Sequence, residues 1–159
     1  MAYSAFTGKW IMNLYPPLLF NRVVTKRISK DFKEVDVVIK KSWINKNLQG
    51  SIFGGTLFSA ADPFYAMMYW NIFAHRKVKM EAWVRHIEGD YSKPSNTNMY
   101  LQFRITDAEI LEAEQSVERD GKFKKFHTIE LKNEQGEVCV SFKILVIIRK
   151  AIKEEKGVF

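Results

Sequence analysis

Cysteine is almost absent from this sequence, and that scarcity limits the kind of protein it can be. Cys139 is the only one in 159 residues, so neither a disulfide framework nor a cysteine-based zinc cluster can hold the fold. Its position between Val138 and Val140 in a strand-like run predicts a small buried hydrophobe, not a nucleophile. A reducing, cytoplasmic location fits this composition best.

The sequence also lacks a long apolar run. Its longest early stretch, Trp10–Phe20, is interrupted by Asn13 and by Pro16 and Pro17, and it is shorter than the ~20 apolar residues that cross a bilayer. No basic segment followed by an apolar one marks a secretory signal. We therefore expect no membrane partner.

Acidic residues are outnumbered by basic ones, 18 to 25, and the formal net charge is +7. Lysines gather at 122–125 and in the tail at 149–156, but no helix-turn-helix, zinc-finger or basic heptad pattern accompanies them. The favoured interpretation of the excess of basic residues is that they lie at solvated strand ends and in a polar tail. The next is a surface that attracts a phosphorylated small molecule. A nucleic-acid site comes last, so no nucleic-acid partner is expected.

What is present is the composition of a globular domain, with 47 % hydrophobic and 14 % aromatic residues. The length suits one domain with a real core, and the aromatic content favours a pocket or an interface. We predict a single domain over 1–159, with an N-terminal helix within 1–20 and a polar tail at 149–159.

The order of elements follows from hydrophobic periodicity. Thr106 and Glu109 form a capping box before the third helix, and the last strand is apolar on both faces, which predicts a central position. An α+β fold results, in which an antiparallel sheet of five to six strands wraps one long central helix, with N-terminal and late accessory helices. We predict helices at 4–14, 54–74 and 107–118, and strands at 23–28, 35–39, 80–89, 99–105, 123–131 and 137–148.

The stretch NLQGSIFGGTLFSAADPF, residues 47–64, carries the candidate chemistry. A helix that begins at Gly54 and Gly55 presents free backbone N–H groups that a ligand can approach closely, because glycine has no side chain. This pattern predicts an oxyanion hole, although a glycine pair also suits a tight loop packed against a strand.

Two turns further along this helix, Asp62 is expected to be buried among aromatic residues with no basic partner nearby. Burial would raise its pKa and strengthen it as a base; alternatively, its carboxylate hydrogen-bonds a neighbouring backbone. Pro63 cannot donate to the carbonyl of Ser59, so the helix should kink there. The kink either aims Asp62 or marks the junction of two shorter helices.

These residues carry a family resemblance. The pattern N-x-x-G-S-x-F-G-G followed by Asp62 resembles the N-x-x-G-[TS]-x-H-G-G…D signature of hot-dog-fold acyl-CoA thioesterases of the phenylacetyl-CoA type. With Pro63, the W-V-R-x-I segment at 83–87 and the Y-S-K-P turn at 91–94, the sequence is most similar to an uncharacterised branch of that superfamily, domain of unknown function 4442. The resemblance implies the hot-dog fold and a homodimer, or a dimer of dimers, with active sites at the interface.

The resemblance also implies roles for individual residues. The N–H of Gly54 or Gly55 would hold the oxyanion, Asp62 from the partner's helix would act as base or nucleophile, and Asn47 would position water or the thioester. Coenzyme A would enter only as part of the substrate, and no cofactor or metal is implied. Substrate contacts are expected at Phe53, Thr56, Phe58, Tyr65 and Arg85, the last one together with the 122–125 lysines toward coenzyme A phosphates.

Phe53 departs from the family pattern, because it stands where the signature has histidine. A phenyl ring cannot hydrogen-bond a carbonyl, and this also argues against the dehydratases of the same fold. No assisting serine or threonine is evident in the strand at 81–89. The three histidines of the chain, His75, His86 and His127, have no metal-ligand spacing and are predicted to be structural or on the surface.

Three interpretations of function remain. The leading one is a thioesterase that hydrolyses an acyl-CoA or acyl-carrier thioester. The alternative is a non-catalytic acyl-thioester binding protein that has kept the pocket. The third is a structural dimer in which Asp62 is ion-paired inside the core.

Overall fold

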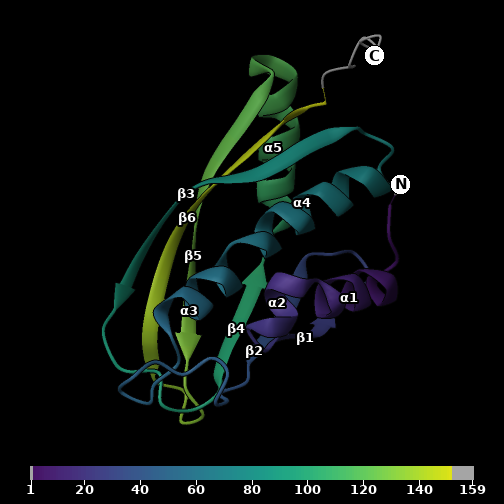
Figure 1. Cartoon of the computed structure of the whole chain (residues 1–159). Coiled ribbons are helices and arrows are strands. Elements are labelled where there is room, and N and C mark those ends of the chain that lie inside the picture. Colours follow the sequence, from purple (N-terminus) through teal and green to yellow (C-terminus); the bar gives the residue numbers. More distant parts are fainter. Residues whose placement is uncertain (1, 152–159) are drawn as a thin grey trace, which may run out of the picture.

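The computed structural model describes residues 2–151 as one curved sheet with helices on it (Figure 1). The helices are α1 (Ala5–Leu14), α2 (Pro16–Phe20), α3 (Gly54–Ala61), α4 (Pro63–His75) and α5 (Asp107–Asp120). The strands are β1 (Val23–Ile28), β2 (Glu34–Ile39), β3 (Met80–Tyr91), β4 (Met99–Arg104), β5 (Lys122–Lys132) and β6 (Val138–Lys150).

The six strands form a single sheet in the order β1-β2-β4-β5-β6-β3, and every neighbouring pair is antiparallel. The sheet curves around α3 and α4, as Figure 1 shows. The predicted sheet wrapped around one long helix is therefore confirmed. The last strand, β6, lies between β5 and β3 as its apolar sequence predicted, and Phe142, Ile144 and Val146 on it are fully buried.

The long central helix is interrupted at Pro63, as the sequence predicted. Helix α3 ends at Ala61 and α4 begins at Pro63, while Asp62 between them keeps helical backbone angles (φ −66°, ψ −58°). Leu57, Phe64 and Met68 are buried against the sheet, so both segments contribute to one core. The break is a junction of two helices on nearly one line.

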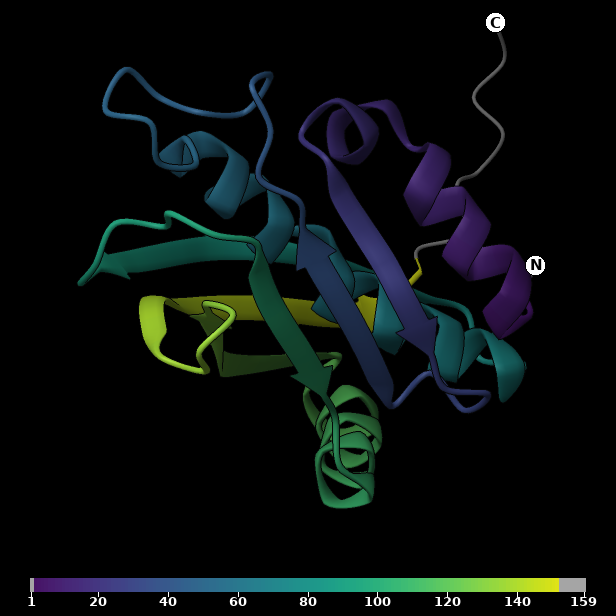
Figure 2. The same ribbon diagram turned by 90° about the horizontal axis from the view of Figure 1, so that it is seen from below.

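The N-terminal region contains two helices where we predicted one. The Ser4 hydroxyl accepts a hydrogen bond from the N–H of Thr7 (3.1 Å) and so caps α1. The proline pair ends α1 as expected, but Pro16 also begins α2, since proline is favoured at the first position of a helix. Figure 2 shows α1 and α2 beside β1, on the same side of the sheet as α3.

The late part of the chain follows the predicted pattern. The capping box of Thr106 and Glu109 is present at α5, and Gly121 ends that helix in a left-handed conformation (φ 73°). Cys139 is buried, as expected for a small hydrophobe. The polar tail was predicted to begin two residues too early, because β6 continues to Lys150; residues 152–159 lie outside the described part of the chain.

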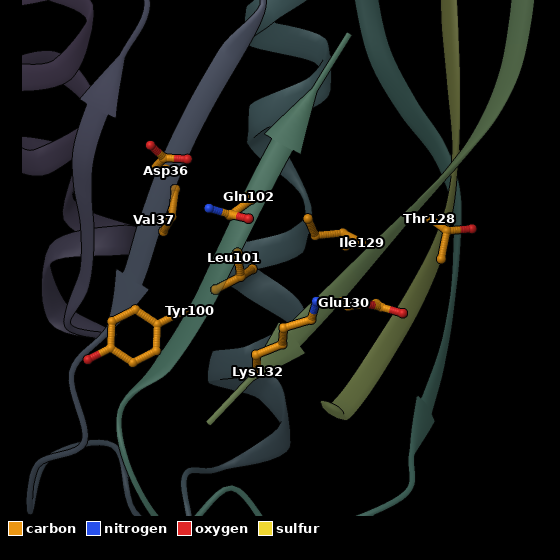
Figure 3. Close-up of a pocket in the computed structure, with 9 residues that line it drawn as sticks. All are labelled: Asp36, Val37, Tyr100, Leu101, Gln102, Thr128, Ile129, Glu130 and Lys132. Carbon is orange, nitrogen blue, oxygen red and sulfur yellow. Dashed lines mark ion pairs between the residues drawn. The ribbon is translucent and has the colours of Figure 1, made fainter. Parts of the chain in front are cut away.

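Pairing in the sheet is weakest in its middle. Among the described residues, β4 and β5 pair only at Tyr100 and Lys132, and a hollow of about 400 Å³ opens between these strands (Figure 3). An ion pair between Glu130 and Lys132 (3.1 Å) lies within it. None of the predicted site residues lines this hollow.

Over residues 2–151, no helix has the length and apolar character needed to cross a bilayer.

Candidate functional site

The start of α3 is fixed by the loop that precedes it. Asn45 is buried, and its side-chain amide donates to the carbonyls of Asn21 and Lys40, both at 3.0 Å. The carbonyl of Asn45 in turn accepts a hydrogen bond from the N–H of Phe53 (2.8 Å). These bonds hold the residue before α3 against the end of α2 and the end of β2.

Asn47 closes the same loop. Its Nδ2 donates to Oγ of Ser51 (2.8 Å), and its Oδ1 accepts the N–H of Ser51 (3.1 Å). Both ends of the amide are engaged, so this residue shapes the loop. The predicted task of positioning water or a thioester stays a prediction, because each end of the amide keeps a further hydrogen-bonding position.

The N-terminus of α3 is left without a cap. Phe53 occupies the capping position but cannot make a capping hydrogen bond, and the N–H groups of Gly54 and Gly55 bond to no described residue. The hydroxyl of Tyr91 donates to the carbonyl of Gly54 (3.2 Å), and its ring packs against that glycine. Gly54 therefore packs on β3, as the tight-loop interpretation requires. The oxyanion hole stays a prediction.

The ring of Phe53 lies over Gly55. A Cβ on Gly55 would come within 2.4 Å of Cε1 of that ring, which no side chain can do without displacing it. Phe53 is 57 % exposed. It therefore covers one side of the helix terminus with an apolar, accessible surface.

A groove of about 550 Å³ runs past this helix terminus. Of the predicted site residues it contains Asn47 and Gly54. Its wall also includes Ser95, whose buried Oγ makes no hydrogen bond with any described residue. The lining residues are Asn47, Gln49, Ser51, Ile52, Gly54, Leu57, Tyr91, Ser92, Lys93, Pro94, Ser95 and Asn96.

Tyr91, Lys93 and Ser95 are among the groove residues that sequence reasoning missed. All three lie in or beside the Y-S-K-P turn that the sequence analysis used only as a family marker. The N–H of Ile52, two residues before Gly54, donates to the carbonyl of Ser95 (2.9 Å) and brings this turn against the start of α3. The Y-S-K-P motif was the one signal in the sequence that could have pointed to these residues. That the turn lies close to the glycine pair follows from strand pairing, which the motif does not show.

Asp62 is exposed on the isolated chain, so the prediction that it is buried was wrong. It makes no hydrogen bond or ion pair with a described residue, and partial desolvation alone raises its pKa. The helix is apolar on almost every side, which is why the pattern did not reveal which face meets the sheet. Phe58, one turn earlier on the side of the helix that also carries Asp62, is 41 % exposed. We call this side of the helix, with Phe58 and Asp62, the outward stripe.

The glycine pair and the acid cannot act on one carbonyl within one chain. Gly54 and Asp62 are eight residues apart on one helical line, which corresponds to about 12 Å at 1.5 Å per residue. A complete site containing both groups therefore needs a second copy of the helix.

Two predicted substrate contacts are inside the protein. Thr56 is 1 % exposed, and its hydroxyl donates to Oδ1 of Asn21 (2.6 Å). Tyr65 is 3 % exposed, and burial raises its pKa to about 12. These placements correct the prediction, because neither side chain can reach a ligand. Arg85 is exposed at a bulge in β3 and does not line the groove.

His127 belongs to the core. Its ring stacks on Tyr65 (4.1 Å between centroids), and its Nε2 lies 3.2 Å from the hydroxyl of Tyr69. Burial lowers its pKa to about 4, so it is neutral at physiological pH and structural, as predicted. His75 and His86 are exposed. The described residues contain no group of three or more side chains that could hold a metal ion.

Solved structures share this fold. A Pseudomonas aeruginosa protein of unknown function, described as a probable thioesterase, is 17 % identical, with 95 % of this chain and 99 % of that chain covered at a TM-score of 0.85. A Haemophilus influenzae thioesterase is 6 % identical (98 % and 96 % covered, TM-score 0.70). The Escherichia coli PaaI protein of the phenylacetic acid degradation operon is 15 % identical (94 % and 97 % covered, TM-score 0.62). No curated protein sequence matches the chain.

The sequence comparison agrees with the fold. The model of one family, described as Domain of unknown function (DUF4442), matches residues 5–148, which is nearly all of the described chain. The sheet wrapped around α3 and α4 is the hot-dog fold, and the chain belongs to the DUF4442 family.

Proposed function

We propose that this protein is a thioesterase that hydrolyses acyl-CoA or related acyl-carrier thioesters at a site shared by two copies of the chain. The observation that carries the proposal is the uncapped N-terminus of α3 at the wall of a groove. The same helix exposes Asp62, an unpaired carboxylate of raised pKa. The similarity to thioesterase structures supports the reaction class.

The chemistry follows from these two groups. The free N–H of Gly54 or Gly55 would donate to the thioester carbonyl oxygen as negative charge develops on it. Asp62 of the other copy would take a proton from water, and the water oxygen would bond to the carbonyl carbon. The carbon–sulfur bond then breaks, the thiolate recovers the proton, and a carboxylic acid and a thiol leave.

The sheet has a free edge strand with which a second copy of the chain could pair. Strand β3 is the last strand of the sheet and spans 12 residues, and a long unpaired edge strand is a template for pairing with another chain. The outward stripe of the long helix, which includes Phe58 and Asp62, lies on a side that the sheet does not cover. Pairing of two β3 strands would bring two such helices together, with a dimer of dimers as a further option.

Replacement of the acid tests the proposal. In Asp62→Asn we expect release of free thiol from a panel of acyl-CoAs to fall by roughly 10²–10⁴-fold, the usual contribution of a general base. Light scattering should show an unchanged molecular mass. Asp120→Asn, an exposed aspartate on α5, is the matched control and should keep wild-type turnover. Undiminished hydrolysis in Asp62→Asn would contradict the assignment.

Two observations favour the second candidate, a non-catalytic acyl-thioester binder. Phe53 offers the glycine pair no polar partner, and the amide of Asn47 is already engaged by Ser51. A thermal-shift screen over acyl-CoAs together with the thiol-release assay separates the two functions. Stabilisation by a ligand without release of thiol would replace the thioesterase proposal with the binder.

The third interpretation, a structural dimer with Asp62 ion-paired in the core, finds no support in the single chain, since Asp62 has no partner among residues 2–151. The reducing, cytoplasmic location expected from the single cysteine stays a prediction.

A further inference from the structure

The outer side of α1 and α2 carries large apolar side chains where a surface helix normally carries polar ones. Along α1 the buried residues include a glycine, Gly8, which lies against Phe32, while Phe6, Trp10 and Leu14 point away from the core at a spacing of one turn. An amphipathic helix of a globular protein has the opposite arrangement. The exposed large hydrophobic residues of both helices are Phe6, Trp10, Ile11, Leu14, Leu19 and Phe20, with Tyr15 between them.

The loop before α3 continues this surface. The hydrogen bond from Asn45 to the carbonyl of Asn21 holds the loop against the end of α2. In Figure 2 the loop and the two helices lie along the same side of the molecule. Trp43, Ile44 and Leu48 on the loop are exposed, Trp43 by 80 %. We call this combined surface of α1, α2 and the loop at 40–48 the N-terminal face.

The charges on the N-terminal face have one sign. No aspartate or glutamate occurs in residues 1–30 or in residues 37–61. A groove of about 440 Å³ between α1, α2 and β1 is bordered by Lys9, Arg22, Lys26 and Lys40. None of these four forms an ion pair with a described residue, and no acidic residue occurs in the segments that carry them. The face therefore presents unneutralised positive charge around exposed aromatic rings.

We propose that the N-terminal face binds the surface of an anionic membrane. Tryptophan, tyrosine and phenylalanine settle at the level of the lipid headgroups, where one end of the ring is apolar and the other is wet. Lysine and arginine beside them gain from the negative potential of acidic lipids. The expectation of no membrane partner rested on the lack of a spanning segment, and a peripheral contact needs none.

A second copy of the chain fits this face less well. A two-fold interface brings the same patch of each copy together, so the four bases would face one another without an intervening acid. An anionic bilayer instead complements every charge on the face. The proposal is independent of the thioesterase reaction, and its test measures binding to vesicles and not enzymatic turnover.

Vesicle flotation tests the proposal. The full chain is mixed with sealed vesicles of phosphatidylcholine alone or of phosphatidylcholine with phosphatidylglycerol. We expect it to float only with the latter, and less so as salt is raised, because exposed charges are screened. Failure to float with phosphatidylglycerol vesicles at low salt would overturn the proposal.

Paired variants separate the apolar and the basic contribution. Phe6→Ser with Trp10→Ser, and separately Lys9→Gln with Lys26→Gln, should each weaken the partition onto phosphatidylglycerol vesicles by about tenfold or more. The controls are Leu111→Ser, an exposed leucine on α5, and Lys122→Gln with Lys124→Gln, two exposed lysines on β5. The controls should bind as the wild type does.

Two results would assign the face differently. An equal loss in the Lys122→Gln and Lys124→Gln control would show that net charge alone binds the vesicle, and would overturn a specific face. A lower molecular mass of Phe6→Ser with Trp10→Ser in light scattering would identify a second copy as the occupant. Unchanged thermal unfolding of each variant shows that the loss is not one of folding.

Discussion

Two helices of this protein begin in opposite ways. At α5, the N–H of Glu109 donates to the hydroxyl of Thr106 (3.2 Å), and the carboxylate of Glu109 accepts the N–H of Thr106 (2.7 Å). At α3, the capping position holds Phe53, the first two residues are glycines, and their N–H groups have no described partner.

The two termini differ in whether their backbone donors stabilise the fold or stay free. A capping side chain contributes about 1 kcal/mol to stability, and α5 has one. Helix α3 forgoes it and is held in place by burial of Leu57, Ala60 and Ala61. Donors that no side chain occupies remain available to a ligand, and under our proposal this is the reason α3 is uncapped. The predictions below exploit this contrast, from the largest expected effect to the smallest.

The α5 terminus is tied to a buried histidine, and this should make it sensitive to acid. Oε1 of Glu109 lies 3.8 Å from Nδ1 of His127, whose pKa burial lowers to about 4 from 6.5. As pH falls through this window the unfolded chain binds the proton first, so stability present above pH 6.5 is lost toward pH 4. The loss is at most roughly 3 kcal/mol.

Urea unfolding at neutral pH and near pH 5 measures the first part of this loss. Glu109, whose own pKa is lowered, still holds its charge at pH 5. In His127→Phe the stacking on Tyr65 is kept and the titrating group is gone, so the difference between the two pH values should shrink. An equal difference in that variant would assign the acid sensitivity to another group.

The α3 terminus should be intolerant of a methyl group at one of its two glycines. In Gly55→Ala the new Cβ displaces the ring of Phe53, and we expect turnover to fall by about ten- to a hundredfold as the oxyanion donors shift. In Gly54→Ala the new Cβ would meet Tyr91 at an ordinary 3.5 Å, so a loss of turnover there would report crowding of the groove and not displacement of the Phe53 ring. Adding Phe53→Ala to Gly55→Ala should recover part of the turnover, and no recovery would mean that the ring is not the obstacle.

Removal of the α5 cap should cost stability and nothing else. Thr106→Ala removes the hydroxyl that accepts the N–H of Glu109 and leaves that helix donor without its partner, so we expect the free energy of unfolding to fall by about 1 kcal/mol. Thiol release per folded molecule should stay at the wild-type value. A change in turnover would show that α5 communicates with the groove.

A capping side chain introduced at α3 should raise the free energy of unfolding, the opposite of the effect at α5. Phe53 has the extended backbone that a capping residue needs (φ −61°, ψ 133°), so the hydroxyl in Phe53→Ser can accept a free N–H. We expect a gain of about 0.5 kcal/mol in stability and a lower turnover, because the donors are now occupied. Higher turnover at unchanged stability would instead indicate that a polar group at this position assists the reaction.

Most of the fold could be predicted because its signals are local. The period-two pattern of β2, the Thr106 capping box and the proline break at Pro63 each depend on residues close together in the sequence. The extra helix α2 was missed, since proline was used only as the end of one helix and not as the start of another. Where β6 ends was also missed, because Arg149 and Lys150 look like a tail until they pair with β3 and β5.

The candidate site could be predicted only in part, because its remaining contacts join distant residues. Nothing in the sequence near Thr56 shows that its hydroxyl meets Asn21, and nothing near Tyr65 shows that it stacks on His127. The orientation of an almost uniformly apolar helix is decided by the strands that surround it. For this reason Asp62 is exposed whereas Tyr65, three residues later, is buried.

The sparse pairing of β4 with β5 has a consequence for how the molecule opens. The sheet consists of two well-bonded halves, β1-β2-β4 and β5-β6-β3, joined in the described chain at Tyr100 and Lys132. Units bonded internally but weakly to each other tend to open separately. In native-state hydrogen exchange, we expect the amides of β4 that face the seam to exchange well before those of β6, and the two halves to protect their amides as separate cooperative units.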